Sequence, residues 1–310
     1  MTAYIVQRIT FLLPICAGIL LITFLLEAFI PTDVVSMMYQ GQASEQQASE
    51  AMQRMRARFN LDKPWYVRFF YYSASVLRGD LGVSVRTRRP VASELGYRLV
   101  NTLKLTAASL VIAVVVGLTS GILSAYYKDS ILDVLGQAIG LFGLSMPAFF
   151  FGIVLIMIFA VRLKLVPVIG LGDWRHLILP ALTLGLIESA SLSRISRSSM
   201  LDVLNQDYIR TARAKGLREQ WVIFRHALKN VLLPVTTVLG LKIGGLLGGA
   251  FIIEVVFAWH GVGELAVKAI QWRDFTITQG IILLSAGIYV MVNLVVDVLY
   301  VYIDPRIRYR

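Results

Sequence analysis

The chain has 310 residues, of which 57% are hydrophobic and only 16% are charged. Soluble domains carry about 25% charged residues, so a soluble chain of this composition would lack the polar groups to cover its surface. The net charge of +11 would suggest a nucleic-acid partner in a soluble protein, but here the charges stand in clusters between long uncharged runs, as a lipid bilayer requires. The composition therefore excludes a soluble protein and predicts an all-α integral membrane protein whose basic charge is better explained by orientation in the membrane and contact with lipid than by a nucleic-acid partner.

Six apolar runs are long enough to cross a bilayer as helices, because about 20 residues rising about 1.5 Å each span the hydrocarbon core. In chain order they are Ile9–Ile30, Leu105–Tyr127, Val134–Val161, Leu177–Ile195, Val231–Val256 and Phe275–Val296. The first run is too long for the apolar part of a signal peptide, so we expect it to remain as a span. Pro147 lies in the middle of the third run and predicts a kink there.

Basic residues are concentrated in the segment 194–233, between the fourth and fifth runs, and in the tail 304–310. Short loops rich in Lys and Arg stay in the cytoplasm, so both segments are expected there, and six spans then place the N-terminus inside as well. Within the outer segment, the spacing of Met52, Met55 and Phe59 predicts a short amphipathic helix. The expected organisation is a first transmembrane helix in 1–30, an external segment in 31–98, a transmembrane domain in 99–303 and a cytoplasmic tail in 304–310.

The segment Asp207–Leu217 has the signals of a short helix. Asp207 is expected to be its N-cap, because a carboxylate there accepts hydrogen bonds from backbone N–H groups of the first turn. Lys215 suits the last turn, and Gly216 suits the position after it, because glycine adopts positive φ without strain. The pattern predicts a helix of about two turns, then a turn, then a second helix through Trp221–Asn230.

One face of the first of these helices carries Ile209, Ala212, Arg213 and Gly216, spaced at i, i+3, i+4 and i+7. This face is low and narrow at Ala212 and Gly216, so it would fit a groove on another protein while the neighbouring arginines meet acidic rims. Two other interpretations stay open. One is a basic helix–turn–helix that binds DNA, against which the flanking spans argue because they hold it at the membrane. The other is an ordinary loop held to anionic lipid by its charges.

This loop also resembles that of a known family. The sequences Tyr208–Leu217, Arg225–Asn230 and Leu233-Pro234 together resemble the cytoplasmic coupling loop of ABC importer permeases. More narrowly, the chain is similar to the first permease subunit of the dipeptide, oligopeptide and nickel importer family. The other segments that carry this resemblance are Leu61–Pro64, Gly79–Gly82, Asn101–Leu103, Ser145–Pro147, Gly248-Gly249, Phe257–Gly263 and Asp304–Arg308.

The chain departs from the general pattern of these permeases at three places. Its loop has Arg210-Thr211-Ala212 where the general loop begins with Glu-Ala-Ala, although the narrower family commonly departs in this way. The separation between Gly216 and Pro234 is longer than in the general pattern. His260 stands in the outer turn where relatives often carry proline, so this turn lacks an expected source of rigidity.

The resemblance implies the type I ABC importer permease fold, with six transmembrane helices, in the inner (cytoplasmic) membrane. It implies a pore-forming subunit that imports di- or oligopeptides or similar small solutes. Its expected partners are a second homologous permease subunit, two ATP-binding subunits and an extracytoplasmic substrate-binding protein. Nickel or a metal-chelator complex is the alternative substrate within the family, and an ion-gradient-driven secondary transporter is the alternative from another class.

ATP is expected to bind elsewhere. The sequence lacks the Gly-x-x-x-x-Gly-Lys-Ser/Thr loop that cradles phosphates, so this chain is expected to hold no cofactor, while the partner ATPase subunits bind ATP and Mg²⁺. The resemblance assigns the coupling to these subunits to Asp207, Tyr208, Arg210, Ala212, Arg213, Ala214, Gly216 and Leu217.

Polar, charged and glycine or proline residues near the spans are the candidates for a translocation path or gate: Ser145, Pro147, Glu188, Lys242, Gly249, Trp259, Gly261 and Gly263. Charges inside a membrane face protein or water rather than lipid, so Glu188 and Lys242 either pair with each other or mark the path of a polar substrate. The glycines around Gly249 also fit close helix packing. The three histidines lie far apart in the sequence, and the pattern predicts no catalytic residues, no metal site and no enzyme.

Overall fold

The computed structural model describes residue 10 and residues 14–25, 63–84, 86–170 and 172–303. Within these residues the regular structure is helical, apart from an isolated antiparallel bridge between Val83 and Pro90. The predicted helix at Met52–Phe59 and the tail 304–310 lie outside the described residues.

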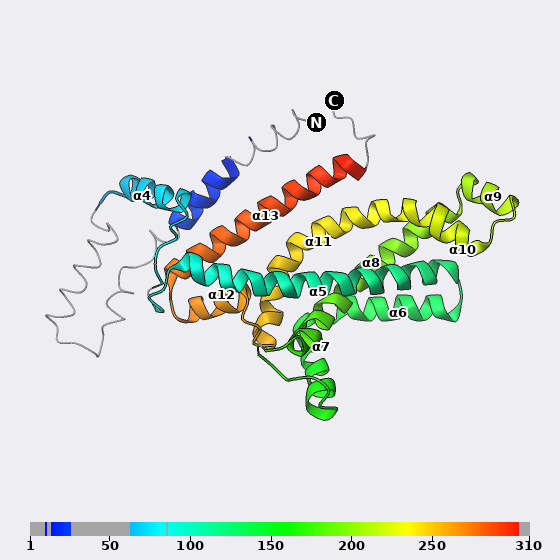
Figure 1. Ribbon diagram of the computed structural model, residues 1–310, viewed down its shortest axis with the longest axis horizontal. Coiled ribbons are helices and arrows are strands. Elements are labelled where there is room, and N and C mark those ends of the chain that lie inside the picture. Colours follow the sequence, from blue (N-terminus) through cyan, green and yellow to red (C-terminus); the bar gives the residue numbers. More distant parts are fainter. Residues whose placement is uncertain (1–9, 11–13, 26–62, 85, 171, 304–310) are drawn as a thin grey trace. The chain divides into compact units, whose positions relative to one another are not determined.

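The helices follow one another along the chain as Figure 1 labels them. A first helix, Pro14–Leu25, precedes the labelled ones. The labelled helices, with the two π-helices η1 and η2 that continue two of them, are α4 (Trp65–Leu77), α5 (Val91–Tyr126), α6 (Ile131–Ser145), α7 (Ala148–Leu155) with η1 (Ile156–Arg162), α8 (Arg175–Leu204), α9 (Asp207–Ala214), α10 (Glu219–Trp221) with η2 (Val222–Ala227), α11 (Leu228–Val256), α12 (Val262–Gln271) and α13 (Phe275–Ile303).

Four helical stretches of the described chain are long and apolar enough to cross a membrane, or five if one bent pair counts as a single span. The four are Val91–Tyr126, Arg175–Leu204, Glu219–Gly240 and Phe275–Val295, and the pair is Ile131–Gly143 with Ala148–Arg162. The fold is therefore that of an all-helical membrane protein with four to five candidate spans. The described part of the first apolar run, Pro14–Leu25, is helical but shorter, so a count of six stays a prediction.

The third predicted span is wrong as a continuous helix. The chain turns through 106° between α6 and α7, and the turn lies at Met146 and Pro147. Met146 has extended backbone angles (φ −86°, ψ 131°), which is the conformation that a following proline imposes on the residue before it. Pro147 is the N-cap residue of α7 (φ −59°, ψ 131°), and because it has no N–H it cannot continue the hydrogen bonds of α6. Proline therefore separates two helices instead of kinking one.

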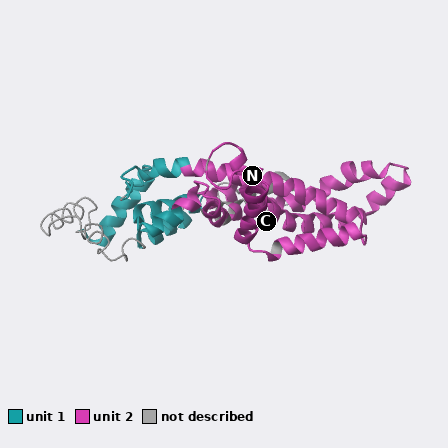
Figure 2. Ribbon diagram, turned by 90° about the horizontal axis from the view of Figure 1, so that it is seen from below, with its two compact units in different colours: residues 1–97, 266–287 teal, residues 98–265, 288–310 magenta. Residues whose placement is uncertain are grey.

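The chain forms two compact units, which Figure 2 shows in different colours: residues 1–97 with 266–287, and residues 98–265 with 288–310. In the first unit, Phe24 is buried and its ring packs edge-on against Phe69 of α4, with centroids 5.4 Å apart. In the second unit, α8 packs against α6, α7 and α11, so it is the central helix of that unit.

Helices α5 and α8 approach each other closely through glycine. A Cβ atom on Gly121 would lie 2.5 Å from the carbonyl oxygen of Ser193, and one on Gly117 would lie 2.6 Å from Cβ of Leu192. Small residues allow helix backbones to come this near in a membrane, where packing rather than hydrophobic burial drives association. The contact holds α8 in place, and α8 carries both the partly buried Glu188 and the base of the α9 loop.

Candidate functional site

The short helix α9 forms where the sequence predicts it. It runs from Asp207 to Ala214, and Gly216 follows in the left-handed region with φ +78°. The backbone N–H of Leu217 bonds back to the carbonyl of Ala212 and that of Gly216 to Arg213, which is how a glycine-terminated helix satisfies its last carbonyls. The predicted two turns and glycine stop are confirmed.

The predicted N-cap is wrong by one residue. The cap position belongs to Gln206, which has extended backbone angles (φ −76°, ψ 149°). Asp207 is the first helical residue, where its negative carboxylate still interacts favourably with the positive end of the helix dipole. It lies 3.9 Å from the guanidinium of Arg210, one turn along the same surface.

One side of α9 is buried inside this chain. Ile209 is 0% exposed and Ala212 6%, in a cluster that also contains Met200 of α8, Val222 of η2 and Val231 of α11. The expectation that Ala212 lies on a face that fits a groove of another protein is therefore wrong, because the apolar side of this amphipathic helix packs onto the core of its own chain. This burial fastens α9 to the helices that precede and follow it.

The predicted second helix is not a separate element. The backbone stays helical from α10 through η2 into α11: Val222 has φ −60° and ψ −46°, and Leu228 has φ −55° and ψ −40°. The stretch predicted as Trp221–Asn230 is therefore the beginning of the long helix that carries the fifth apolar run. A movement of this segment is a movement of α11 itself.

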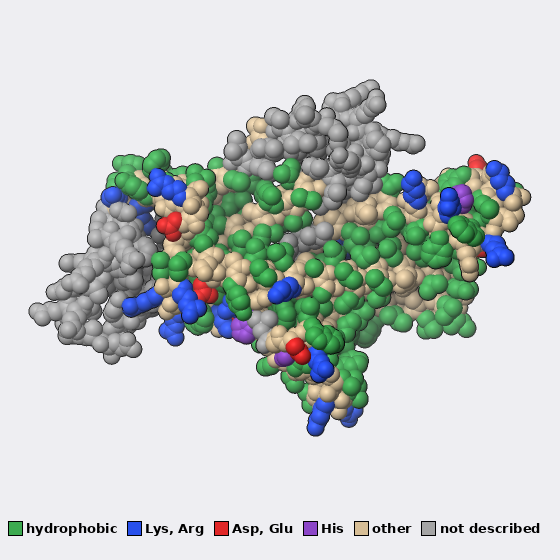
Figure 3. All heavy atoms as spheres, viewed as in Figure 1, with side chains coloured by type: hydrophobic (Ala, Val, Ile, Leu, Met, Phe, Trp, Pro, Cys, Tyr) green, Lys and Arg blue, Asp and Glu red, His purple; other side chains and the backbone are tan. Residues whose placement is uncertain are grey.

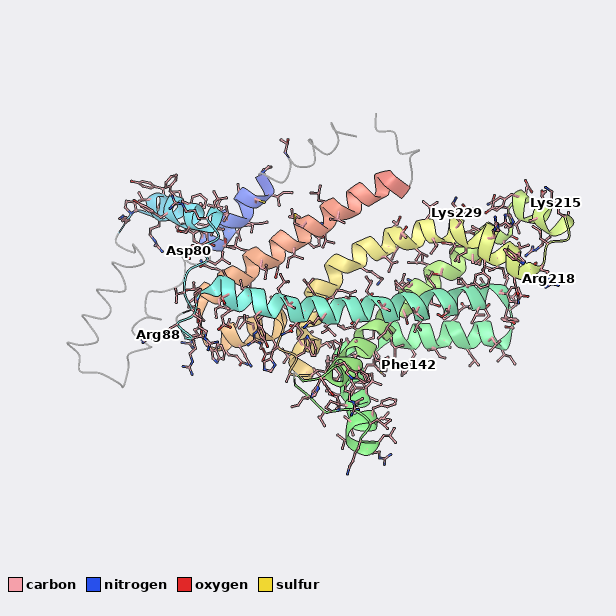
Figure 4. All side chains as sticks on the ribbon, in the orientation of Figure 1. Asp80, Arg88, Phe142, Lys215, Arg218 and Lys229 are labelled. Atoms are coloured by element: carbon pink, nitrogen blue, oxygen red, sulfur yellow. The ribbon has the colours of Figure 1, made fainter. Side chains whose placement is uncertain are left out.

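The opposite side of the α9 loop is exposed, polar and basic. Figure 3 shows Lys and Arg side chains around this tip, and Figure 4 labels Lys215, Arg218 and Lys229 on it. The exposed side chains are those of Asp207, Tyr208, Arg210, Thr211, Arg213, Ala214, Lys215, Leu217, Arg218, Trp221, Phe224, Arg225 and Lys229. We call this set, with Gly216, the α9 surface. Trp221 and Phe224, 56% and 66% exposed, were not among the sequence candidates, because an apolar residue in a helix is normally assigned to a core.

Two contacts stiffen the α9 surface. The guanidinium of Arg213 donates two hydrogen bonds to the carboxylate of Glu219, at 2.6 and 3.2 Å, and this carboxylate raises the pKa of Arg213 above its ordinary value. The side-chain amide of Asn230 donates to the hydroxyl of Tyr208 at 2.6 Å. The first contact crosses the turn at Gly216, and the second joins α9 to α11.

Glu188 and Lys242 come together between α8 and α11. The ammonium of Lys242 donates to the Glu188 carboxylate, and their side chains are 22% and 27% exposed respectively. Of the two alternatives left open by the sequence, the structure shows the pairing. Each charge lies within a long apolar helix, where an ionised side chain needs a partner.

The other path candidates are scattered. Ser145 and Pro147 are exposed at the bend between α6 and α7, and the Ser145 hydroxyl donates to the carbonyl of Leu141 within α6. Gly249 lies in α11, and its surroundings are outside what the structure describes. Trp259 and two glycines meet at a different place, the junction that follows α11.

This junction is built around the carboxylate of Glu254, which is 0% exposed. One oxygen accepts from the Thr102 hydroxyl at 2.6 Å, and the other accepts from the backbone N–H groups of Gly263 and Glu264 at 2.7 and 3.1 Å. The carboxylate thus caps the start of α12, and Thr102 accepts in turn from the N–H of Val262 at 2.9 Å. A buried carboxylate with several donors is satisfied electrostatically.

The glycines and the tryptophan of the junction serve this arrangement. A Cβ atom on Gly261 would lie 2.1 Å from a Glu254 oxygen, and one on Gly263 would lie 2.4 Å from the Cα of Phe251. The Trp259 indole N–H donates to the Asn101 carbonyl at 2.9 Å, and the Asn101 amide donates to the His260 carbonyl at 3.0 Å. Trp259, Gly261 and Gly263 pack around Glu254 here, and their role in a path stays a prediction. Glu254 was missed although it is an acidic residue at the end of an apolar run.

A second buried carboxylate was also missed. Asp133, 1% exposed, accepts two hydrogen bonds of 2.7 Å from the guanidinium of Arg197. The Ser124 hydroxyl, the Gln137 amide and the backbone N–H of Asp129 donate to it as well. Arg197 therefore ties α8 to α6, in addition to its expected share in the basic charge of the loop. A bidentate arginine fixes both distance and orientation.

The junction makes a test of side-chain hydrogen bonding possible within one helix. Thr102→Val removes one donor to the buried Glu254 carboxylate and leaves the Val262 N–H without its acceptor, so we expect a loss of about 1–3 kcal/mol in stability. Thr106, one turn on, is 5% exposed, and its hydroxyl finds no partner within the described residues. Thr106→Val is the matched control and should leave the thermal unfolding midpoint of the purified complex unchanged or raise it. Equal midpoints for both variants would contradict the assignment.

Comparison with known proteins places this geometry in a family. A family model described as "Binding-protein-dependent transport system inner membrane component" matches residues 117–309. The chain is 40% identical, over 310 residues and 100% of both chains, to the glutathione transport system permease protein GsiC of Escherichia coli (strain K12). The protein of the same name from Shigella flexneri serotype 5b (strain 8401) matches equally, with 40% identity over the full length of both chains.

Solved structures show the same fold at lower identity. An inward-facing structure of the MetNI methionine ABC transporter matches with a TM-score of 0.58 and 19% identity, covering 68% of this chain and 96% of that chain. An amino acid ABC transporter crystallised with histidines matches with a TM-score of 0.52 and 18% identity, covering 69% and 94%. The fold is thus that of the ABC importer permeases. Together with the full-length identity, it shows that the chain belongs to the family of binding-protein-dependent transport system inner membrane components, as a permease subunit of an ABC transporter and not an enzyme.

Proposed function

We propose that this chain forms the pore of an ATP-driven importer of small peptides of the glutathione type. The observation that carries the substrate class is the 40% identity over the whole length of permeases named for glutathione transport. Glutathione is a tripeptide, which agrees with the peptide importer family that the sequence motifs resemble. Nickel or a metal chelate stays the alternative substrate.

The proposal includes the assembly and its orientation. It has the type I permease fold with six spans, both termini and the α9 loop in the cytoplasm, and residues 31–98 mainly outside. The partners are a second permease subunit, two ATP-binding subunits that hold ATP and Mg²⁺, and an external substrate-binding protein. The family description supports the binding protein directly, and the basic α9 loop supports the orientation.

The α9 surface is the proposed contact with the ATPase. Its residues, Tyr208, Arg210, Ala214, Gly216 and Leu217 among them, are exposed, whereas Ile209 and Ala212 fasten the helix to α8 and α11. A force applied to the surface therefore passes to both long helices through buried contacts. These helices carry Glu188 and Lys242, and a two-state change in their packing is how such transporters alternate access.

The Glu188–Lys242 pair is the proposed polar point of the translocation path. A zwitterionic peptide brings an ammonium and carboxylates, so it can exchange partners with the two side chains. Both side chains are partly exposed on this chain, as contact with a bound peptide would require.

The function is tested by uptake into proteoliposomes that contain the whole complex. With the binding protein outside and ATP inside, labelled glutathione should accumulate, unlabelled glutathione should compete, and ionophores that collapse ion gradients should have no effect. Uptake of nickel without peptide, or uptake that needs an ion gradient instead of ATP, would reject the proposal.

The coupling contact is tested by enlarging one residue on each side of α9. Ala214→Trp adds bulk to the exposed side of a helical residue, so insertion and assembly should be normal while uptake falls about tenfold or more, the loss that about 1.4 kcal/mol of docking energy would produce. Gly216→Trp should lose uptake as well. Ala212→Trp is the matched control: it overpacks a buried site and should lower the amount of folded subunit in the membrane. Normal uptake with Ala214→Trp would remove the α9 surface from the coupling.

The path role of the ion pair is tested by a double-mutant cycle. Glu188→Gln or Lys242→Met alone leaves one charge unpaired, at a cost approaching the about 3–5 kcal/mol of a fully buried pair. Glu188→Gln with Lys242→Met removes both charges and should recover the unfolding midpoint. If the pair meets substrate, the double variant stays deficient in glutathione uptake despite its recovered stability. Full recovery of uptake would show that the pair only holds α8 to α11.

A further inference from the structure

Helix α4 carries an exposed aromatic surface that neither the coupling nor the path uses. Trp65, Tyr66, Phe70, Tyr71 and Leu77 are 60%, 59%, 71%, 50% and 82% exposed. Three of them, Tyr66, Phe70 and Leu77, are spaced at i, i+4 and i+11 and so share one side of the helix. We call these three residues the aromatic face. Trp65 shares the side of Phe69 and Tyr72, and Tyr71 lies between the two sides. A cluster of large apolar side chains of this kind marks an interaction surface.

The other side of α4 is anchored to the first apolar helix. The ring of Phe69 packs against Phe24, and the hydroxyl of Tyr72 donates to that of Thr23 at 3.2 Å. The amide of Gln279, from α13, donates to the Thr23 carbonyl at 3.1 Å. Helix α4 is therefore held beside Thr23 and Phe24, which stand three to four residues before Glu27, the first charged residue of the apolar run after Arg8. A charged residue marks the part of such a run that nears the membrane surface.

The charges within α4 and at its two ends are basic: Lys63, Arg68 and Arg78, with Asp62 and Asp80 further out, so that the segment 62–80 has a net charge of +1. The Lys63 ammonium lies 4.6 Å from the centre of the Tyr71 ring, and Lys63 and Arg78 are exposed just beyond the two ends of the helix. The combination of Trp and Tyr with flanking cations is typical of segments at the boundary between acyl chains and lipid headgroups.

We propose that α4 lies flat in the membrane–water interface, with its aromatic face inserted between lipid headgroups and its terminal cations on lipid phosphates. The helix has 13 residues, about 20 Å of length, so it is too short to cross a hydrocarbon core of about 30 Å. The aromatic face contacts lipid and not a protein, because α4 packs against an apolar helix that the bilayer surrounds, so that lipid is already adjacent to α4. In the proposed orientation this is the external leaflet. The inference itself depends only on the membrane fold and not on the substrate.

The immersion of the aromatic face can be measured with spin labels. Cys16 is the only cysteine of the chain, so Cys16→Ser with Phe70→Cys, or with Leu77→Cys, gives a single labelling site in the full complex in lipid nanodiscs. Collisions with oxygen should exceed those with a water-soluble nickel chelate severalfold at both sites, because oxygen concentrates in lipid. Lys128→Cys, in the exposed turn after α5, is the water-facing control and should show the reverse. The two α4 sites are independent, so the test survives if one variant fails to assemble.

Three results would overturn the proposal. Labels at 70 and 77 as accessible to the nickel chelate as the label at 128 would place the aromatic face in water. Labels shielded from both reagents, or immobilised only when the external binding protein is added, would assign the face to a protein. A second arm tests the cations: Lys63→Gln with Arg78→Gln should make the label at 70 shallower in nanodiscs of anionic phosphatidylglycerol but not in zwitterionic phosphatidylcholine. An unchanged depth in both lipids would reject the phosphate contacts.

Discussion

A carboxylate enclosed by protein must find its hydrogen bonds there, and Glu254 shows how much of a structure that requirement can determine. Its two oxygens gather donors from α5 and from the first residues of α12. The turn between α11 and α12 must then pass so close that Gly261 has no room for a Cβ atom. The loss of any one of these donors would lower the stability of the fold by about 1–3 kcal/mol or more. The end of α11, the turn and the start of α12 are therefore fixed as one unit.

The α9 loop applies a different constraint to the same long helix. Ile209 and Ala212 are buried between α8 and α11, and Asn230 of α11 reaches Tyr208 of α9. Helix α11 is thus held at one end by a polar cluster around Glu254 and at the other by apolar packing around α9. Between the two lie Lys242 and its bond to Glu188. A helix held at both ends can pass a displacement from one end to the other, which suits a transport subunit driven by a separate ATPase.

Local signals in the sequence predicted local features well. The glycine after α9, the apolar runs behind α5, α8, α11 and α13, and the pairing of Glu188 with Lys242 as one of two alternatives all follow from spacing and polarity. The errors came from features that depend on neighbours in space. The prediction that Ala212 is exposed to a partner was wrong, because periodicity identifies the apolar side of a helix but not whether that side contacts the same chain or another one. Pro147 ended a helix where a kink was expected, and Glu254 was missed because its donors are about 150 residues earlier in the chain or in the next helix.

The π-helix η2 gives the unusual spacing between Gly216 and Pro234 a physical meaning. A π-helical turn closes over one residue more than an α-helical turn, and η2 occupies six residues, Val222–Ala227, directly after α10. Such a turn takes up one extra residue, and Val222 at the start of η2 and Val231 of α11 are both buried in the same cluster. A single residue added within η2 would therefore lengthen the chain between α9 and α11 without rotating α11 about its axis.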